Sequence, residues 1–303
     1  MGDPTHFHIS GGANPFTRTW WGKKKQVDRE RAIAQWHQMK DTLERLGLKV
    51  YVIPPDPQNP GLVYPANAGF VVQPEAIIPL PERSFYLSHL LPSRARETPV
   101  YDLFLRSLGM KPVRIQHRFE GEADFFPVGH EYIFTYGAVV TQKFVPKLAI
   151  PPWQRQYGFR SESAVLPELQ EKVGRDILIH PFELLEESHY HGDTVFCSFG
   201  KNREALLVYL EGLTPEARGR CQHIFGDRLI PLSTRDAFFF AANAFQVLTS
   251  MGLTLFIPEG VSTALLKQIE AHGVQPYPMD VSEFLNKGGG SVKCMIGDLG
   301  SIP

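Results

Sequence analysis

Cysteine is scarce in this sequence, and neither sign of charge is in excess. The 303 residues include three cysteines, Cys197, Cys221 and Cys294, and no two of them have CxxC spacing. So few cysteines, in an odd number, argue against a disulfide framework or a zinc-thiolate site and predict a reducing compartment, the cytoplasm. The formal net charge is -1, so the chain lacks the cationic excess that nucleic-acid and anionic-membrane partners require. The one basic cluster, at residues 23–25, is interpreted as a solvated face.

Long apolar runs and flexible linkers are also missing. No stretch approaches the roughly 20 apolar residues that span a bilayer. The first ten residues, MGDPTHFHIS, have no basic start followed by an apolar core, so we expect no secretory signal. No Ser/Gly-rich or low-complexity tract divides the chain, and we therefore predict that residues 1–303 form a single domain. Nothing in the sequence indicates an oligomeric state.

A repeated phrase of helix, glycine and strand organises the chain. Residues 28–47 carry apolar side chains at three- and four-residue intervals and end at Gly47, which indicates an amphipathic helix. Residues 48–55 follow as an expected buried strand that proline stops. The same phrase is predicted three more times, with helices at 98–109, 203–213 and 262–273 and following strands at 110–115, 227–232 and 274–279.

Between these phrases lie further apolar segments that we expect to be strands. They occupy residues 69–73, 76–80, 132–140, 194–200, 245–250 and 253–258. Helix, strand and strand pair recur about every 50 residues or somewhat more, which predicts a repeated α/β module rather than two unrelated domains.

The first segment with chemical potential is EGEADFFPVG, residues 120–129. It places Glu120, Glu122 and Asp124 within five residues, between two apolar stretches. A solvated acidic turn is the simplest interpretation. However, Asp124 directly precedes Phe125 at an expected strand start, where a buried carboxylate requires a cationic partner.

The second segment, ESHYHGDTVFCSFG, covers residues 187–200. His189, His191, Asp193 and Cys197 raise the possibility of a metal site, because side chains at alternating strand positions share one face. No second ligand cluster completes such a site, so we expect neither a metal nor another cofactor. We instead interpret His191 and Asp193 as a general acid/base beside an anionic contact.

The third segment is the last sixteen residues, GGGSVKCMIGDLGSIP. Cys294 is either a nucleophile or a small buried apolar residue, and spacing alone leaves both readings open. The glycines before it allow a close backbone approach and positive φ. A thiol nucleophile accompanied by a histidine and several carboxylates suits attack on a planar cation such as guanidinium, which carboxylates bind in bidentate fashion.

In this order, the segments resemble those of the penteins, a superfamily of guanidino-group-modifying enzymes. It includes dimethylarginine dimethylaminohydrolase, arginine deiminase, arginine dihydrolase and the amidinotransferases. The matching motifs are Asn14-Pro15-Phe16, the Ala-Asn-Ala strand with Asn67, SRARE with Arg94 and Glu97, EGEADFF, HGDTVF and SEFLNKGGGSVKCM. The sequence departs from the family at Gly192, where leucine is usual, and at Glu122-Ala123, where small residues are common.

The resemblance implies a fold and a set of roles. The fold is a fivefold pseudosymmetric α/β propeller of ββαβ-type modules, with the active site in the central channel. The implied roles are Cys294 as nucleophile, His191 as general acid/base, Asp124 and Asp193 as the guanidinium-binding pair, and Asn67, Arg94 and Glu120 at the substrate. The family also places a carboxylate near the histidine, and Glu162 and Glu183 both remain candidates.

The implied activity is hydrolysis of the guanidino group of arginine or Nω-methylated arginine through a covalent amidino-cysteine intermediate. Asn67 is similar to the asparagine of arginine dihydrolases, which favours free arginine. Arg94 either binds an α-carboxylate or pairs with Glu97. Two alternatives stay open: an amidinotransferase that passes the amidino group to an amine, and a non-catalytic binding protein on the same fold.

Overall fold

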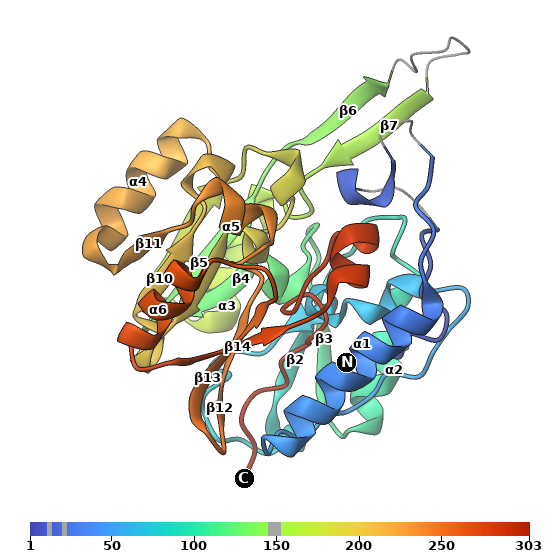
Figure 1. The fold of residues 1–303 in the computed structure, drawn as a ribbon, viewed down its shortest axis with the longest axis horizontal. Helices are drawn as coiled ribbons and strands as arrows, with labels where there is room; N and C mark the ends of the chain where they lie inside the picture. Colours follow the sequence, from blue (N-terminus) through green and yellow to red (C-terminus); the bar gives the residue numbers. More distant parts are fainter. Residues whose placement is uncertain (11–13, 20–22, 145–152) are drawn as a thin grey trace.

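The computed structural model, which describes residues 1–10, 14–19, 23–144 and 153–303, repeats one sheet pattern four times (Figure 1). In each three-stranded sheet an antiparallel pair comes first, and a third strand then pairs in parallel with the middle one. A helix lies between the second and third strands each time. This is the predicted ββαβ module.

The elements have the following bounds. The helices are α1 (Arg29–Arg45), α2 (Glu97–Ser107), α3 (Leu166–Val173), α4 (Pro215–Phe225), α5 (Thr234–Phe238) and α6 (Thr263–Ala271). The first two sheets contain β1 (Gly69–Phe70), β2 (Ser84–Leu87) and β3 (Lys111–Arg114), and β4 (Phe125–Val128), β5 (Glu131–Tyr136) and β8 (Ile179–Glu183). The other two contain β9 (Phe196–Phe199), β10 (Ala205–Val208) and β11 (Leu229–Pro231), and β12 (Phe245–Thr249), β13 (Gly252–Pro258) and β14 (Gln275–Met279).

The four sheets surround a common centre. Residues of the first strand of every sheet, β1, β4, β9 and β12, line the same small cavity. A separate hairpin of β6 (Val139–Phe144) and β7 (Trp153–Gly158) follows β5 and projects away from the body (Figure 1). In the part of the chain that is described, no helix is both long enough and apolar enough to cross a membrane.

The helices predicted at residues 28–47, 98–109 and 262–273 are confirmed as α1, α2 and α6. Side-chain caps stabilise the first turns of two of them. The side chain of Asp28 accepts a hydrogen bond from Arg31 N at the start of α1, and Ser262 does the same for Leu265 N at the start of α6. Apolar residues of α1, α2 and α6 face the core. The strands expected at 110–115, 194–200, 227–232, 245–250, 253–258 and 274–279 are also confirmed, as β3, β9, β11, β12, β13 and β14.

The helix predicted at residues 203–213 is wrong. Its Ala-Leu-Leu-Val stretch forms β10, the central strand of its sheet, and all four residues are buried. A strand covered on both faces is apolar throughout, so its pattern cannot be distinguished from a short buried helix. The helix of this module is α4, which begins after the N-cap Thr214 with proline at its first position.

Two predicted strands are also wrong, and two more have different bounds. Residues 48–55 form only a single parallel bridge, Ile53 to Gly2, and residues 76–80 form no strand. Ile77 is 71% exposed, and the strand of this module is β2. Residues 132–140 divide between β5 and β6, while residues 69–73 contain only the two-residue β1.

The beginning and end of the chain meet beside the centre. One core cluster joins Met1, Phe7 and apolar residues of α1 to residues near the C-terminus, including Phe284 and Met295. The Asn14 side chain donates to Gly288 O at 2.8 Å, and Ala66 N donates to Cys294 O at 3.4 Å. The last predicted segment is therefore held against the first module.

Candidate active site

The loop that carries Cys294 follows a π-helical turn at Phe284–Gly288. A Cβ atom on Gly288 or Gly290 would collide with the ring of Tyr64, and Gly289 has φ of +81°. The Tyr190 hydroxyl donates to Gly289 O at 2.9 Å. The three glycines thus allow the loop to pack tightly against aromatic side chains, as expected from their sequence position.

Cys294 lies on this loop and is 2% exposed. Its sulfur is 3.4 Å from Asp193 Oδ2 and 3.2 Å from Asn243 Nδ2. Burial and the neighbouring carboxylate raise the pKa of the Cys294 thiol well above its ordinary value. The thiolate therefore requires an added positive charge in the site to become the favoured form.

His191 is oriented by the Glu120 carboxylate, and the amide of Asn67 lies beside both. Its Nε2 lies 2.9 Å from Glu120 Oε2 and 3.3 Å from Asn67 Nδ2. Burial alone would raise the pKa of Glu120, but the hydrogen bond and charge of His191 outweigh it and lower that pKa to about 2. Because the ionised carboxylate can only accept, the proton of the neutral ring belongs on Nε2, and Nδ1 is the basic nitrogen.

The carboxylate that supports the histidine is Glu120, a correction to both expected candidates. Glu162 accepts a hydrogen bond from Arg118 N at 3.0 Å, and its other oxygen lies 3.8 Å from the Arg118 guanidinium. Glu183 is at the end of β8, where it pairs with Tyr136 of β5. Glu120 was expected at the substrate. Its contact with His191 could not be predicted from a local sequence pattern, because the two residues are 71 positions apart.

Asp193 has one oxygen toward the sulfur and one without a partner. Its Oδ1 is buried and makes no hydrogen bond within the described residues, and the same holds for His191 Nδ1. Burial and the charge of Asp124 raise the pKa of Asp193 to about 6, although His191 opposes the shift. A buried carboxylate oxygen without a donor is costly unless a ligand supplies one.

Asp124 does not face the site as the expected second guanidinium-binding carboxylate. Its Oδ1 accepts from Thr135 Oγ1 at 2.7 Å and from Gly192 N at 2.9 Å, and its Oδ2 accepts from Ser161 Oγ at 2.6 Å. Burial raises the pKa of Asp124, while His191 and these donors oppose the shift. Because protein donors occupy both oxygens, Asp124 supports the segment that carries His191 and Asp193.

The two departures from the family pattern have structural reasons. A Cβ atom at Gly192 would collide with the Thr135 side chain, so the leucine usual at this position does not fit here. Glu122 is buried and forms an ion pair with Lys293 at 2.7 Å, and it accepts a hydrogen bond from Asp298 N. Burial raises the pKa of Glu122 to about 7, although the Lys293 ammonium opposes the shift.

Asn67 joins the site, whereas Arg94 is held beside it. Besides its contact with His191, Asn67 Nδ2 donates to Glu120 Oε2 at 3.3 Å. Arg94 forms a two-point pair with Glu97, at 2.9 Å and 2.6 Å, and donates to Gly61 O at 3.0 Å. Of the two roles left open for Arg94, the structure has the ion pair.

One site residue was missed altogether. Asn243, 0% exposed, hydrogen-bonds both the backbone and the sulfur of Cys294. Its signal in the sequence is a lone amide inside the apolar stretch FFFAANAF. Buried amides must be hydrogen-bonded, so a single polar residue in such a run indicates a structural or functional contact.

The side chains of the segment that was considered as a possible metal site do not converge. The His189 ring packs against Tyr209 and Phe240, and Cys197 Sγ lies 3.7 Å from Ala244 O. Across the described ranges, no three or more His, Cys, Asp and Glu side chains are grouped to hold a metal ion.

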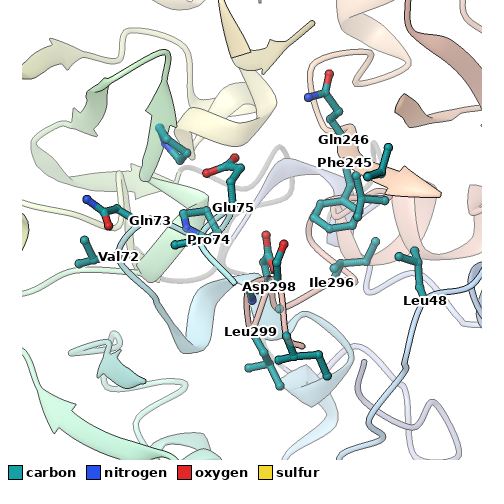
Figure 2. Close-up of a pocket in the computed structure, with 18 of the residues that line it drawn as sticks. Leu48, Val72, Gln73, Pro74, Glu75, Phe245, Gln246, Ile296, Asp298 and Leu299 are labelled. Carbon is teal, nitrogen blue, oxygen red and sulfur yellow. Dashed lines mark hydrogen bonds between the residues drawn. The ribbon is translucent and has the colours of Figure 1, made fainter. Parts of the chain in front are cut away.

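A separate groove has a volume of about 1210 Å³. Figure 2 shows that Gln73, Pro74 and Glu75 line it on one side and Phe245 on the other, with Asp298 between them. None of the predicted site residues lines it. A smaller cavity, bounded by Asp193 and Lys293, shares Asp298, Phe245 and other residues with the groove.

Comparisons with known proteins agree with this geometry. A family model described as N,N dimethylarginine dimethylhydrolase, eukaryotic, matches residues 157–300. The N(G),N(G)-dimethylarginine dimethylaminohydrolase of Mycobacterium tuberculosis is 29% identical over 294 residues, which cover 97% of this chain and 83% of that protein. The bifunctional arginine dihydrolase/ornithine cyclodeaminase AgrE of a Nostoc species is 25% identical over 299 residues, 97% of this chain and 37% of AgrE. This chain is similar to both.

Solved structures confirm the pentein fold. The N-terminal domain of ArgZ, an arginine dihydrolase from cyanobacteria, solved as a cysteine-to-serine mutant bound to substrate, superposes with a TM-score of 0.80 at 22% identity. The match covers 100% of this chain and 97% of that chain. A dimethylarginine dimethylaminohydrolase adduct with S-methyl-L-thiocitrulline superposes with a TM-score of 0.67 at 17% identity, covering 97% of this chain and 96% of that chain.

Proposed function

We propose that this protein hydrolyses the guanidino group of arginine or an Nω-methylated arginine through a covalent amidino-cysteine intermediate. The observation that carries the proposal is a buried thiol 3.4 Å from Asp193 Oδ2, together with two buried atoms, Asp193 Oδ1 and His191 Nδ1, that have no hydrogen-bond partner among the described residues. These groups require a ligand that is cationic, planar and electrophilic. A guanidinium has all three properties.

The names of the relatives support the same class of reaction. Those of the mycobacterial and Nostoc proteins specify dimethylarginine and arginine as substrates, respectively. The Cys294, His191, Asp193 and Glu120 set argues against the binding-protein alternative, because a passive binder has no need of an imidazole oriented by a carboxylate and of a buried thiol that contacts Asp193, two residues from that imidazole.

The first step is binding and attack. Asp193 accepts hydrogen bonds from the guanidinium through Oδ1 and orients the central carbon toward the Cys294 sulfur. The cation offsets the negative charge of Asp193 and so lowers the pKa of the thiol. The thiol gives its proton to His191, and the thiolate adds to the central carbon: a C–S bond forms, and the C=N electron pair moves to nitrogen.

The second step is loss of the amine. His191 donates a proton to the departing nitrogen while the C–N bond breaks, leaving the amidino group on the sulfur. Glu120 keeps the ring oriented and stabilises the imidazolium whenever it forms.

The third step is hydrolysis. His191 takes a proton from water, whose oxygen attacks the amidino carbon, and collapse of the adduct breaks the C–S bond. The product is a urea-type compound, and the sulfur returns as thiolate. A second cycle of the same chemistry on that product would release ammonia and then a carbamate that breaks down to ornithine and carbon dioxide, the outcome that the similarity of Asn67 to dihydrolases favours.

The experiment that tests the proposal is an end-point assay on purified protein. Arginine, Nω-methylarginines and agmatine are each incubated with the protein, and citrulline, ornithine, methylamines and ammonia are measured. Cys294→Ser is the inactive variant, and Cys197→Ser is the matched control because Cys197 is also buried but bonds only to backbone carbonyls.

The products distinguish the candidate activities. Ornithine plus ammonia from arginine indicates a dihydrolase, and citrulline plus a methylamine indicates a methylarginine hydrolase. Transfer of the amidino group that depends on an added amine indicates the amidinotransferase. No product from any guanidine, or full activity in Cys294→Ser, rejects the covalent mechanism.

We further propose that residues 1–303 act as one unit in the cytoplasm. The supporting observations are the hydrogen bonds that tie Asn14 and Ala66 to the Cys294 loop, and three buried cysteines without a disulfide. Limited proteolysis that releases a stable, active fragment would contradict the single unit. Fractionation of source cells tests the compartment.

A further inference from the structure

Asn243 lies between α5 and β12 and makes four side-chain hydrogen bonds around Cys294. Its Oδ1 accepts from Cys294 N at 3.1 Å and from Ser291 N at 3.2 Å. Its Nδ2 donates to Cys294 Sγ at 3.2 Å and to Asp193 O at 3.3 Å. One amide therefore touches the backbone of the nucleophile loop, the sulfur and the backbone of the substrate-binding carboxylate.

The orientation of the amide follows from these partners. Two backbone N–H groups converge on one end, so that end must be the acceptor oxygen. The other end is the NH2 group, which then points to the sulfur. A neutral thiol is a weak acceptor, whereas a hydrogen bond to a charged partner is about twice as strong.

The surroundings of the sulfur make such a donor necessary. Burial and Asp193 disfavour the thiolate, while a backbone hydrogen bond from Ser291 and the Asn243 amide favour it. Two further titratable groups, Tyr64 and Tyr190, interact with Cys294, and a thiolate there raises the pKa of both hydroxyls. Asn243 is thus the one side-chain donor at the sulfur within the described residues.

We propose that Asn243 is a catalytic residue that donates a hydrogen bond from Nδ2 to the Cys294 thiolate while its Oδ1 holds the loop that carries it. The role rests on the proposed function, since it assumes that Cys294 is the nucleophile. Through Asp193 O the same amide also fixes the distance between the sulfur and the carboxylate that binds the guanidinium.

Two variants separate the donor role from the loop role. Asn243→Asp keeps an acceptor for Ser291 N and Cys294 N but removes the donor to sulfur. Asn243→Leu removes both at nearly the same volume. Gln35→Leu is the matched control, because Gln35 is a buried amide of α1 whose hydrogen bonds go to Ser282 and Glu283 and to neither Cys294 nor Asp193.

The readout is alkylation of Cys294 by iodoacetamide as a function of pH, followed by mass spectrometry of the Cys294 peptide. No guanidine is present, so the result does not depend on turnover. Hydrogen bonds to charged groups correspond to a shift of about 1–2 pH units in the thiol pKa. We expect that upward shift in Asn243→Asp and Asn243→Leu, and none in Gln35→Leu.

A second measurement needs no substitution at Asn243. In ¹⁵N-labelled wild-type protein, the side-chain amide signal of Asn243 should move during the pH titration that ionises Cys294. It should not move in Cys294→Ser. An unchanged alkylation profile in folded Asn243→Asp, or an amide signal that ignores the thiol titration, overturns the proposal. Absence of guanidine turnover with a shifted alkylation profile would instead reject the proposed function alone.

Discussion

The two carboxylates beside His191 have pKa values displaced in opposite directions. The pKa of Glu120 is lowered to about 2, because its hydrogen bond to His191 and the charge of His191 outweigh the effect of burial. The pKa of Asp193 is raised to about 6 by burial and by the charge of Asp124. Neighbouring acids whose environments separate their pKa values usually have different roles. Glu120 remains an anion that orients the imidazole, whereas Asp193 becomes fully anionic only above about pH 6.

The pH dependence of turnover follows from Asp193. Its pKa lies near 6, so the carboxylate is protonated below that pH and loses its attraction for the guanidinium, which stays cationic throughout. We expect kcat/KM to fall as the pH drops through about 6. Asp193→Asn should lower kcat/KM at pH 8 by about 100-fold or more and remove this acid limb. The idea is rejected if the variant retains the same limb in a pH–rate profile.

Removing the charge of Glu120 should affect both rate and acid stability. Its folded-state pKa lies below the ordinary 4.5, so the Glu120–His191 pair stabilises the fold above about pH 4.5, and this contribution is lost as pH falls toward 2. Glu120→Gln should lower kcat by about 100-fold or more. The variant should also lose less stability between pH 7 and pH 3 than the wild type, because it lacks the Glu120–His191 contribution that acid removes. Urea unfolding at pH 7, 4 and 3 measures this difference.

Glu162→Gln is the matched control for this experiment. Its side chain is 37% exposed and pairs with Arg118 rather than with His191. We expect a change in unfolding free energy of about 1 kcal/mol or less and nearly unchanged kcat. Equal losses in the two variants would contradict the assignment of Glu120.

At the scale of the element, the glycine loop before Cys294 is defined by close packing. A Cβ atom at Gly288 would collide with the Tyr64 hydroxyl, which donates to Phe284 O at 3.1 Å. Gly288→Ala should therefore destabilise the fold by about 1–3 kcal/mol and displace the nucleophile. Combining it with Tyr64→Phe removes the hydroxyl and should recover part of both losses. Strictly additive effects in a double-mutant cycle would contradict the collision.

Elements with one apolar face could be predicted from sequence, and fully buried ones could not. The stripe of Ala32, Trp36, Met39 and Leu43 identified α1 because only one side of that helix meets the core. The buried β10 has no polar face to reveal its period. The pairing of strands within each sheet also could not be predicted, because it depends on contacts between residues that are far apart in the sequence.

Some residues of the candidate site could also be predicted from the sequence, and others could not. Cys294, His191 and Asp193 could be predicted because each lies in a short motif. Their supporting contacts could not, since Glu120 meets His191 across 71 positions and Asn243 meets Cys294 across 51. A ring of modules brings such distant residues together at its centre, so motif residues are visible in sequence while their hydrogen-bond partners are not.

At the scale of the whole molecule, the site lies where the ring closes. The last residues after Cys294 continue past Glu122 to the groove of Figure 2, where Ser301 N donates to Pro74 O at 2.7 Å. Arg83, 3% exposed, donates to Ser301 O at 2.9 Å and to Ala76 O. This arginine therefore joins the first module to the end of the chain.

Loss of the Arg83 contacts should weaken ring closure without altering the chemistry. Arg83→Met removes the donor to the partly buried Ser301 and Ala76 carbonyls, and we expect a loss of about 1–3 kcal/mol in the free energy of unfolding. Arg114→Met is the control, because Arg114 is 63% exposed and lies 4.0 Å from Asp102, so its loss should stay within about 0.5 kcal/mol. Urea unfolding measures both. Since Arg83 touches none of the reacting groups, kcat per folded molecule should be retained in both variants. A loss of kcat in Arg83→Met alone would show instead that closure of the ring also positions Cys294.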